Sequence, residues 1–292
     1  MKRKHHYVPV FYLSGFTVDG HRESPLWVLD TEEYLWRQSK PSAVALKKDL
    51  YRVDVPGFEP DEIENTFMKI ETASAVVFRE IRKTGSLPER PSKDFGTLMT
   101  FIAMQTGRTP WLLNRIAKPL EEMHSQVFEA MFGDRDELQG LKRGEDYWLE
   151  LSQNHRVGIV LSVIHLLVPM LFDRSWCLLE ARDGPFICSE HPVGLKSKVT
   201  LPPVFGPGFG MTDTVVTMPI SKRFALQGEF QELPPTFRAS LQHVAAINSD
   251  TARHAGRFLY ASSKNFLWLN RKGRIESGDT LADAWKEFRS EK

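Results

Sequence analysis

The pattern of apolar residues changes twice along the chain, and this change constrains the fold more than any other feature. Residues 1–55 are rich in aromatic and β-branched residues, which are typical of strands. Residues 60–173 carry apolar residues at helical spacing, residues 175–272 return to a strand-like pattern, and a terminal helix is expected over 279–290. This order predicts an α+β fold, in which N-terminal and C-terminal β segments form one sheet region packed with a central helical region.

The N-terminal β segment holds too few apolar residues between positions 7 and 55 for a core of its own. We therefore expect it to pack against the C-terminal β region, so that residues 1–292 form a single composite domain. The chain has 292 residues, of which 41% are hydrophobic, and it is long enough to bury a sizeable core.

The first helices of the central region can be placed by their spacing and end signals. The first helix follows from one apolar stripe at spacings of four, three, seven and four: Ile63, Phe67, Ile70, Val77 and Ile81. A second helix is expected from about Ser92 to about Arg108, because Thr109 precedes a proline and is pushed out of helical backbone. Thr109 and Pro110 then suit the N-cap and first position of a third helix.

The most apolar stretch, residues 157–172, is predicted to be a helix buried in the centre of the helical region. Its one ionisable residue, His165, is expected to be satisfied by a hydrogen bond. The stretch is shorter than the roughly 20 residues that a membrane-spanning helix needs. We therefore expect no membrane partner.

Several strands and a further helix are expected in the β regions. Residues 26–29 and 34–36 flank a polar turn and predict a hairpin. Asp183-Gly184 is expected to form the turn of a second hairpin, between strands at 176–180 and 186–188. A helix from about Asp250 to Ser262 is expected to interrupt the later strands.

Composition excludes several classes of protein and leaves others open. The 38 basic residues nearly balance the 37 acidic ones, so the formal net charge of +1 gives no global nucleic-acid signature. Two cysteines, Cys177 and Cys188, argue against a disulfide framework and favour a reducing compartment, the cytoplasm. No phosphate-binding loop, dinucleotide glycine pattern, nucleophile elbow or zinc-ligand spacing is present in the sequence.

The most distinctive segment is residues 5–16, HHYVPVFYLSGF. It resembles the opening motif of the bacterial family called domain of unknown function 4238. Other motifs similar to that family follow in order: Asp49-Leu50-Tyr51, Glu64 with Glu71, Arg108-Thr109-Pro110, Ser189-Glu190-His191-Pro192-Val193 and Met218-Pro219-Ile220-Ser221. The chain departs from the pattern at Val10, where a glutamine is expected, and at Glu190-His191, where an Asp-Asn pair is more usual. The resemblance carries over no activity. It implies that these separated motifs belong to one fold.

Three residues are the candidates for proton transfer. His6 maps onto the opening motif, and imidazole can move a proton or bind a metal near neutral pH. In an extended strand, His5 and His6 point to opposite faces, so we do not expect both to serve one centre. Glu71 and Glu190 are the second candidates, as proton carriers or metal ligands. Glu71 alternatively belongs to a solvated helix face, and Glu190 to a simple turn at a strand end.

Four residues are the candidates for substrate binding. Gln105 and Arg108 lie three positions apart at the end of the second helix, so they share a face. With Thr109 at the next helix N-terminus, Arg108 suits an anion site; alternatively, it forms a salt bridge with Glu71 or complements its own helix end. His191 follows Glu190 at a strand end, where loops often present functional side chains.

Two hypotheses of different classes account for these candidates. The first is a phosphodiester-cleaving enzyme, nuclease-like and acting as a toxin or phage-defence effector, with RNA, DNA or a nucleotide as partner. Its cofactor is unknown, and a divalent metal is compatible with its carboxylates. The alternative is a non-catalytic binding or regulatory module whose motifs are structural. Convergence of the His, Arg and Glu candidates on one pocket would favour the enzyme.

Overall fold

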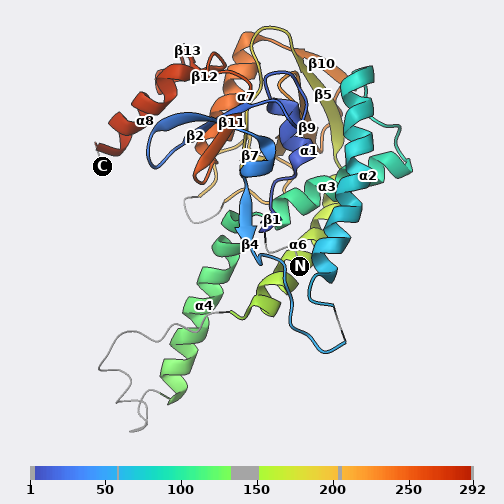
Figure 1. Ribbon diagram of the computed structural model, residues 1–292, viewed down its shortest axis with the longest axis vertical. Coiled ribbons are helices and arrows are strands. Elements are labelled where there is room, and N and C mark those ends of the chain that lie inside the picture. Colours follow the sequence, from blue (N-terminus) through green and yellow to red (C-terminus); the bar gives the residue numbers. More distant parts are fainter. Residues whose placement is uncertain (1–3, 58, 133–150, 203–205, 291–292) are drawn as a thin grey trace.

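The computed structural model describes residues 4–57, 59–132, 151–202 and 206–290. These residues form an α+β fold, as the change of pattern along the sequence predicts (Figure 1). The N-terminal part begins with β1 (Lys4–His6), which pairs antiparallel with β4 (Leu46–Lys48). Between them lie α1 (Val10–Leu13), the 3₁₀ turns Ser14–Phe16 and Pro41–Ala43, β2 (Leu26–Asp30) and β3 (Leu35–Ser39). The hairpin expected over residues 26–36 is the antiparallel pair β2–β3.

The long helices of the central region are α2 (Glu62–Thr84), α3 (Lys93–Gly107), α4 (Pro110–Phe132) and α6 (Gln153–Phe172). Helix α3 has Ser92 as its N-cap, whose hydroxyl accepts the backbone N–H of Phe95 at 3.1 Å. Helix α2 ends at Gly85, which adopts a left-handed conformation with φ 68°. The helix boundaries predicted at Ser92, Arg108 and Pro110 are confirmed. Helix α4 extends away from the sheets in Figure 1.

The prediction that α6 is a buried core helix is wrong. Only 22% of its most apolar 18-residue window is buried. One face, with Val157, Val160, Leu167 and Leu171, is buried, whereas His165 is exposed and Leu166 is 59% exposed. Within the described chain, α6 is long and apolar enough to cross a membrane by length and composition alone. The other elements form a globular fold of the kind found in soluble proteins.

Two larger sheets hold most of the strands. A four-stranded sheet in the order β3-β2-β11-β6 joins the N-terminal hairpin to β11 (Phe258–Ala261) and β6 (Cys188–Ser189), as expected for one sheet region from both ends of the chain. A separate five-stranded sheet has the order β10-β5-β9-β8-β7. Its strands are β5 (Ser175–Ala181), β7 (Gly194–Ser197), β8 (Thr214–Pro219), β9 (Phe224–Glu229) and β10 (Thr236–Ala239).

The hairpin expected at Asp183-Gly184 does not form. The backbone N–H of Phe186 bonds to the carbonyl of Lys222, and the N–H of Ile187 bonds to the side chain of Asn248. Strand β6 then pairs with β11 in the other sheet. The backbone partners of this segment therefore come from distant parts of the chain, which draw it away from β5.

The helix expected over residues 250–262 is also misplaced. Helix α7 runs from Leu241 to Arg253, because Ser240 caps it by accepting the backbone N–H of His243 at 3.3 Å. The chain after α7 forms β11 instead. The last elements are β12 (Leu267–Leu269), β13 (Ile275–Ser277), the 3₁₀ turn Gly278–Thr280 and α8 (Leu281–Ser290).

One large apolar core contains residues from the N-terminal segment, the central helical region and the C-terminal β region. Tyr12, Phe78 and Phe101 pack ring against ring, with Phe78 and Phe101 centroids 4.9 Å apart. The same cluster includes Met218 of β8 and Tyr260 of β11. That residues 1–292 fold as a single composite domain stays a prediction; this shared core is the feature that motivates it.

Candidate functional site

Arg108 lies at the centre of a closed polar cluster. Its side chain is 0% exposed, and its Nη1 is 2.6 Å from Glu71 Oε1. The side-chain oxygen of Gln105 accepts from Arg108 Nε and Nη2, both at 2.7 Å, in the amide orientation that satisfies both groups. Every guanidinium nitrogen is therefore engaged within the protein. The guanidinium carbon also lies 5.8 Å from the ring centre of Phe67.

Tyr51 links this cluster to the N-terminal strand. Its hydroxyl donates to the carbonyl of Arg108 at 2.9 Å, and its backbone N–H donates to His5 Nδ1 at 3.3 Å. The His5 and Tyr51 rings are stacked at 6.0 Å. Burial, together with the nearby charges of Glu64 and Glu71, raises the pKa of Tyr51 against the opposing effect of Arg108. The tyrosine is therefore a neutral hydrogen-bond donor at neutral pH.

Thr109 has the capping role expected from the sequence. It is buried, its hydroxyl lies 3.5 Å from the backbone nitrogen of Leu112, and Pro110 is the first residue of α4. The adjacent Arg108 forms the salt bridge with Glu71 that the sequence left as an alternative to an anion site.

Glu190 forms a second buried cluster with the N-terminal segment. Tyr7 donates its hydroxyl to Glu190 Oε2 at 3.2 Å, and the backbone N–H of Arg257 donates to Oε1. Burial raises the pKa of Glu190, although these hydrogen bonds act in the opposite direction. The Arg257 guanidinium in turn bonds to Asp30 at the end of β2, at 2.8 Å. Glu190 thus connects the N-terminal segment to the start of β11.

His191 lies beside Glu190 and is neutral at neutral pH. Its Nε2 is 3.9 Å from Glu190 Oε1. Burial, reinforced by the nearby His254, lowers the pKa of His191 from 6.5 to about 4. Gly256 makes this close packing possible, since a Cβ there would stand 2.2 Å from Glu190 Oε1 and 2.9 Å from His191 Nε2.

The N-terminal motif uses its residues differently from the expectation. His5 is buried against Tyr51, whereas His6 is only half-buried, and consecutive side chains of a strand leave it in opposite directions. Tyr7 comes back to the face of His5 and is close enough to Tyr51 to affect its pKa. The sequence singled out His6, and His5, Tyr7 and Tyr51 were missed. Strand alternation was the available signal for His5 and Tyr7, and the Asp49-Leu50-Tyr51 motif was the signal for Tyr51.

Six of the seven predicted site residues, all except His6, fall into two groups. Glu71, Gln105, Arg108 and Thr109 belong to the cluster around Arg108, and Glu190 and His191 belong to the cluster around Glu190. Among the described residues, no three His, Cys, Asp or Glu side chains form a group that could hold a metal ion. Two cavities, of about 660 and 590 Å³, are lined by other residues.

A family model described as a protein of unknown function, DUF4238, matches residues 4–265. The chain belongs to this family. The matched range spans the segment from His5 to Ser221, in which the quoted motifs and both polar clusters lie. No curated protein and no solved structure matches the chain. The match ends before β12, β13 and α8.

Proposed function

We propose that this protein is a non-catalytic binding module, and that its motif residues hold the N-terminal segment against the rest of the fold. The observation that carries the proposal is the state of Arg108, whose side chain is 0% exposed and whose nitrogens are engaged by Glu71 and Gln105. An arginine that clamps a phosphate must offer donors to it. The enclosed side chain of Arg108 presents no donor at the protein surface, which supports a structural role.

The Glu190 cluster supports the same proposal. Both carboxylate oxygens accept hydrogen bonds, one from Tyr7 and one from the backbone of Arg257. The side chain of Glu190 is 12% exposed and that of His191 is 8% exposed. Groups that bond across distant segments inside the protein stabilise the fold, whereas a proton carrier must reach its substrate.

A phosphodiester-cleaving enzyme, acting on RNA or DNA as a toxin or defence effector, is the second candidate. It is favoured by the perturbed pair beside β6, in which the pKa of Glu190 is raised and that of His191 is lowered to about 4. Opposite shifts of neighbouring groups recur at catalytic sites, and a neutral histidine can accept a proton.

A cytoplasmic location belongs to the same proposal. Cys177 and Cys188 are both free and buried. Burial raises the pKa of the Cys177 thiol to about 11, so it stays protonated and unreactive. Two unpaired thiols are ordinary in a reducing compartment.

The test pairs catalysis with stability. Wild type, Arg108→Lys and Glu190→Gln are incubated with labelled RNA and DNA, with Mg²⁺, Mn²⁺ or a chelator, and each is also melted. The exposed Glu232→Gln is the matched control for Glu190→Gln. We expect no cleavage by any of them and lower melting temperatures for Arg108→Lys and Glu190→Gln alone. Cleavage by the wild type that Glu190→Gln abolishes at an unchanged melting temperature would contradict the proposal.

A further inference from the structure

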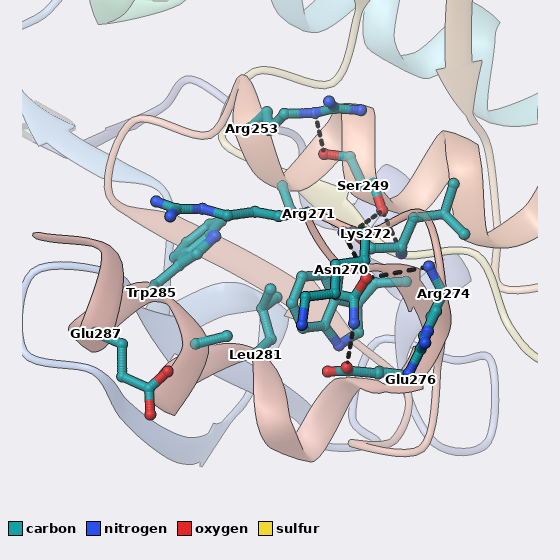
Figure 2. A pocket seen from close by; sticks show the side chains of 14 residues that line it. Ser249, Arg253, Asn270, Arg271, Lys272, Arg274, Glu276, Leu281, Trp285 and Glu287 are labelled. Atoms are coloured by element: carbon teal, nitrogen blue, oxygen red, sulfur yellow. Dashed lines mark hydrogen bonds between the residues drawn. The ribbon is translucent and has the colours of Figure 1, made fainter. Parts of the chain in front are cut away.

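A cavity lies where α7, the β12–β13 hairpin and α8 meet (Figure 2). Its volume of about 660 Å³ falls within the range of small-molecule sites. Ser249 and Arg253 line it from α7, and Trp285 lines it from α8. The hairpin turn contributes Asn270, Arg271, Lys272 and Arg274. Most of the lining lies beyond residue 265, where the family match ends, so binding here does not follow from family membership.

The lining has an excess of positive charge. Arg253, Arg271, Lys272 and Arg274 face two acidic residues, Glu276 and Glu287. Arg253 is paired with Asp250. Lys272 and Arg274 are exposed, and within the described part of the chain no carboxylate lies within salt-bridge distance of either. These two cations are therefore available to an anion.

The hairpin turn holds these cations on a defined backbone. The Asn270 side-chain oxygen accepts the backbone N–H groups of Lys272 at 2.9 Å and Arg274 at 3.0 Å. Gly273 supplies the left-handed conformation of the turn, with φ 70°. The Asn270 amide also donates to one carboxylate oxygen of Glu276. The carboxylate of Glu276 is thus engaged within the hairpin.

An aromatic surface completes the site. Trp285 is partly buried, and in Figure 2 its indole lies across the cavity from Arg274 and Glu276. Trp268, also in the lining, is fixed by its Nε1, which donates to the carbonyl of Ser277 at 3.0 Å. Indole faces stack on nucleobases, and lysine and arginine bind phosphate through charge-assisted hydrogen bonds.

Resting on the proposed binding function, we propose that this cavity binds a nucleoside phosphate. Lys272 and Arg274 hold the phosphate, and Trp285 packs against the base. The same chemistry is offered by a free mononucleotide and by the 5′-phosphorylated end of an RNA strand. The near-neutral charge of the whole chain, +1, suits a small anion better than a long duplex.

The test is isothermal titration of the full chain with four probes: ATP, adenosine, pyrophosphate and a 5′-phosphorylated hexariboadenylate. ATP or the oligonucleotide is expected to bind more tightly than adenosine or pyrophosphate. Adenosine keeps only the contact of its base with Trp285, and pyrophosphate keeps only the contacts of its phosphate groups with Lys272 and Arg274. The double variant Lys272→Ala/Arg274→Ala should weaken that binding at least about tenfold, since each charge-assisted bond is a strong one. Lys286→Ala, an exposed lysine of α8 that does not line the cavity, is the matched control and should bind as the wild type does.

The outcomes separate the ligand from the function. Tighter binding of ATP assigns the site to a free nucleotide, and tighter binding of the oligonucleotide assigns it to an RNA end. No binding of any probe, or equal affinity of the wild type and the double variant, would overturn the inference and leave the non-catalytic role standing. Chromatography of the titrated samples detects breakdown of ATP or the oligonucleotide, which would contradict the non-catalytic role whichever variant binds. Lys272 and Arg274 are both exposed, so folding of the double variant should be unchanged by circular dichroism.

Discussion

Replacing Glu71 by glutamine should destabilise the protein, because it leaves a buried charge without its counter-ion. Arg108 is fully enclosed and depends on Glu71 for its only ion pair among the described residues. Gln105 continues to accept from Nε and Nη2, but a neutral amide does not balance the positive charge. The variant keeps the shape of the side chain, so the change isolates the electrostatic contribution.

The expected loss is about 3 kcal/mol. Breaking a buried ion pair by removing one partner typically costs about 3–5 kcal/mol. The lower end applies because the Glu71 side chain is 23% exposed, so water can reach Arg108 Nη1 when the carboxylate is gone. At about 2–4 °C per kcal/mol for a protein of roughly this size, the melting temperature should fall by roughly 6–12 °C.

Thermal and urea unfolding, followed by circular dichroism, measure this loss. Glu80→Gln, an exposed glutamate on the same helix, is the control and should stay within about 0.5 kcal/mol of the wild type. The double variant Glu71→Gln/Arg108→Met removes the charge as well as its partner, so it should recover part of the stability. If Glu71→Gln melts with the wild type, the ion pair does not stabilise the fold and the structural account of Arg108 is refuted.

Three further predictions test other parts of the structure. The pKa of His191 is about 4 in the folded protein and 6.5 ordinarily, so the imidazole of the unfolded chain takes up a proton at a higher pH than that of the folded protein. The free energy of unfolding should therefore fall by up to about 3 kcal/mol as the pH drops from 6.5 to 4. The raised pKa of Glu190 acts in the opposite direction, so melting curves of wild type and His191→Gln are compared at each pH; parallel curves would contradict the assignment. Gly256→Ala should lower the free energy of unfolding by about 1–3 kcal/mol, because the added Cβ meets Glu190. Gly158→Ala should raise it by about 0.5–1 kcal/mol, since Gly158 lies in the middle of α6 with open space around the added Cβ; urea unfolding measures both. Leu166→Ser should change the free energy of unfolding by under about 1 kcal/mol, whereas Leu171→Ala should lower it by about 2–5 kcal/mol. Equal losses from the two variants would show that both faces of α6 are buried.

The parts of the fold that could be predicted from sequence depend on local chemistry. Ser92, Thr109 and Pro110 mark helix ends through interactions within a few residues, and the structure places those ends as expected. The hairpin at Asp183-Gly184 failed because the N–H groups of the next segment find partners at positions 222 and 248. Such partners are visible only once the chain has folded.

The same distinction applies to α6 and to the candidate site. The apolar content of residues 157–172 predicts a helix but does not say how much of it other elements cover. The Glu71–Arg108 pair was an alternative readable from the sequence, because both lie on predicted helices. Choosing His5 over His6 required the pairing of β1 with β4, which sets the face of each residue. The cavity between α7, the β12–β13 hairpin and α8 required three elements to meet, and its basic turn alone looked like an ordinary exposed loop.

The central claim is that the motif residues hold the N-terminal segment in place. Hydrogen–deuterium exchange of Glu190→Gln, compared with the wild type, tests it most directly. Losing the carboxylate that accepts from Tyr7 and Arg257 should speed exchange of amides in residues 4–16 roughly 10- to 100-fold, from about 1.5–3 kcal/mol for a hydrogen bond to a charged group. Amides of β8 and β9, in the other sheet, should exchange as in the wild type. Unchanged exchange over residues 4–16 would contradict the claim.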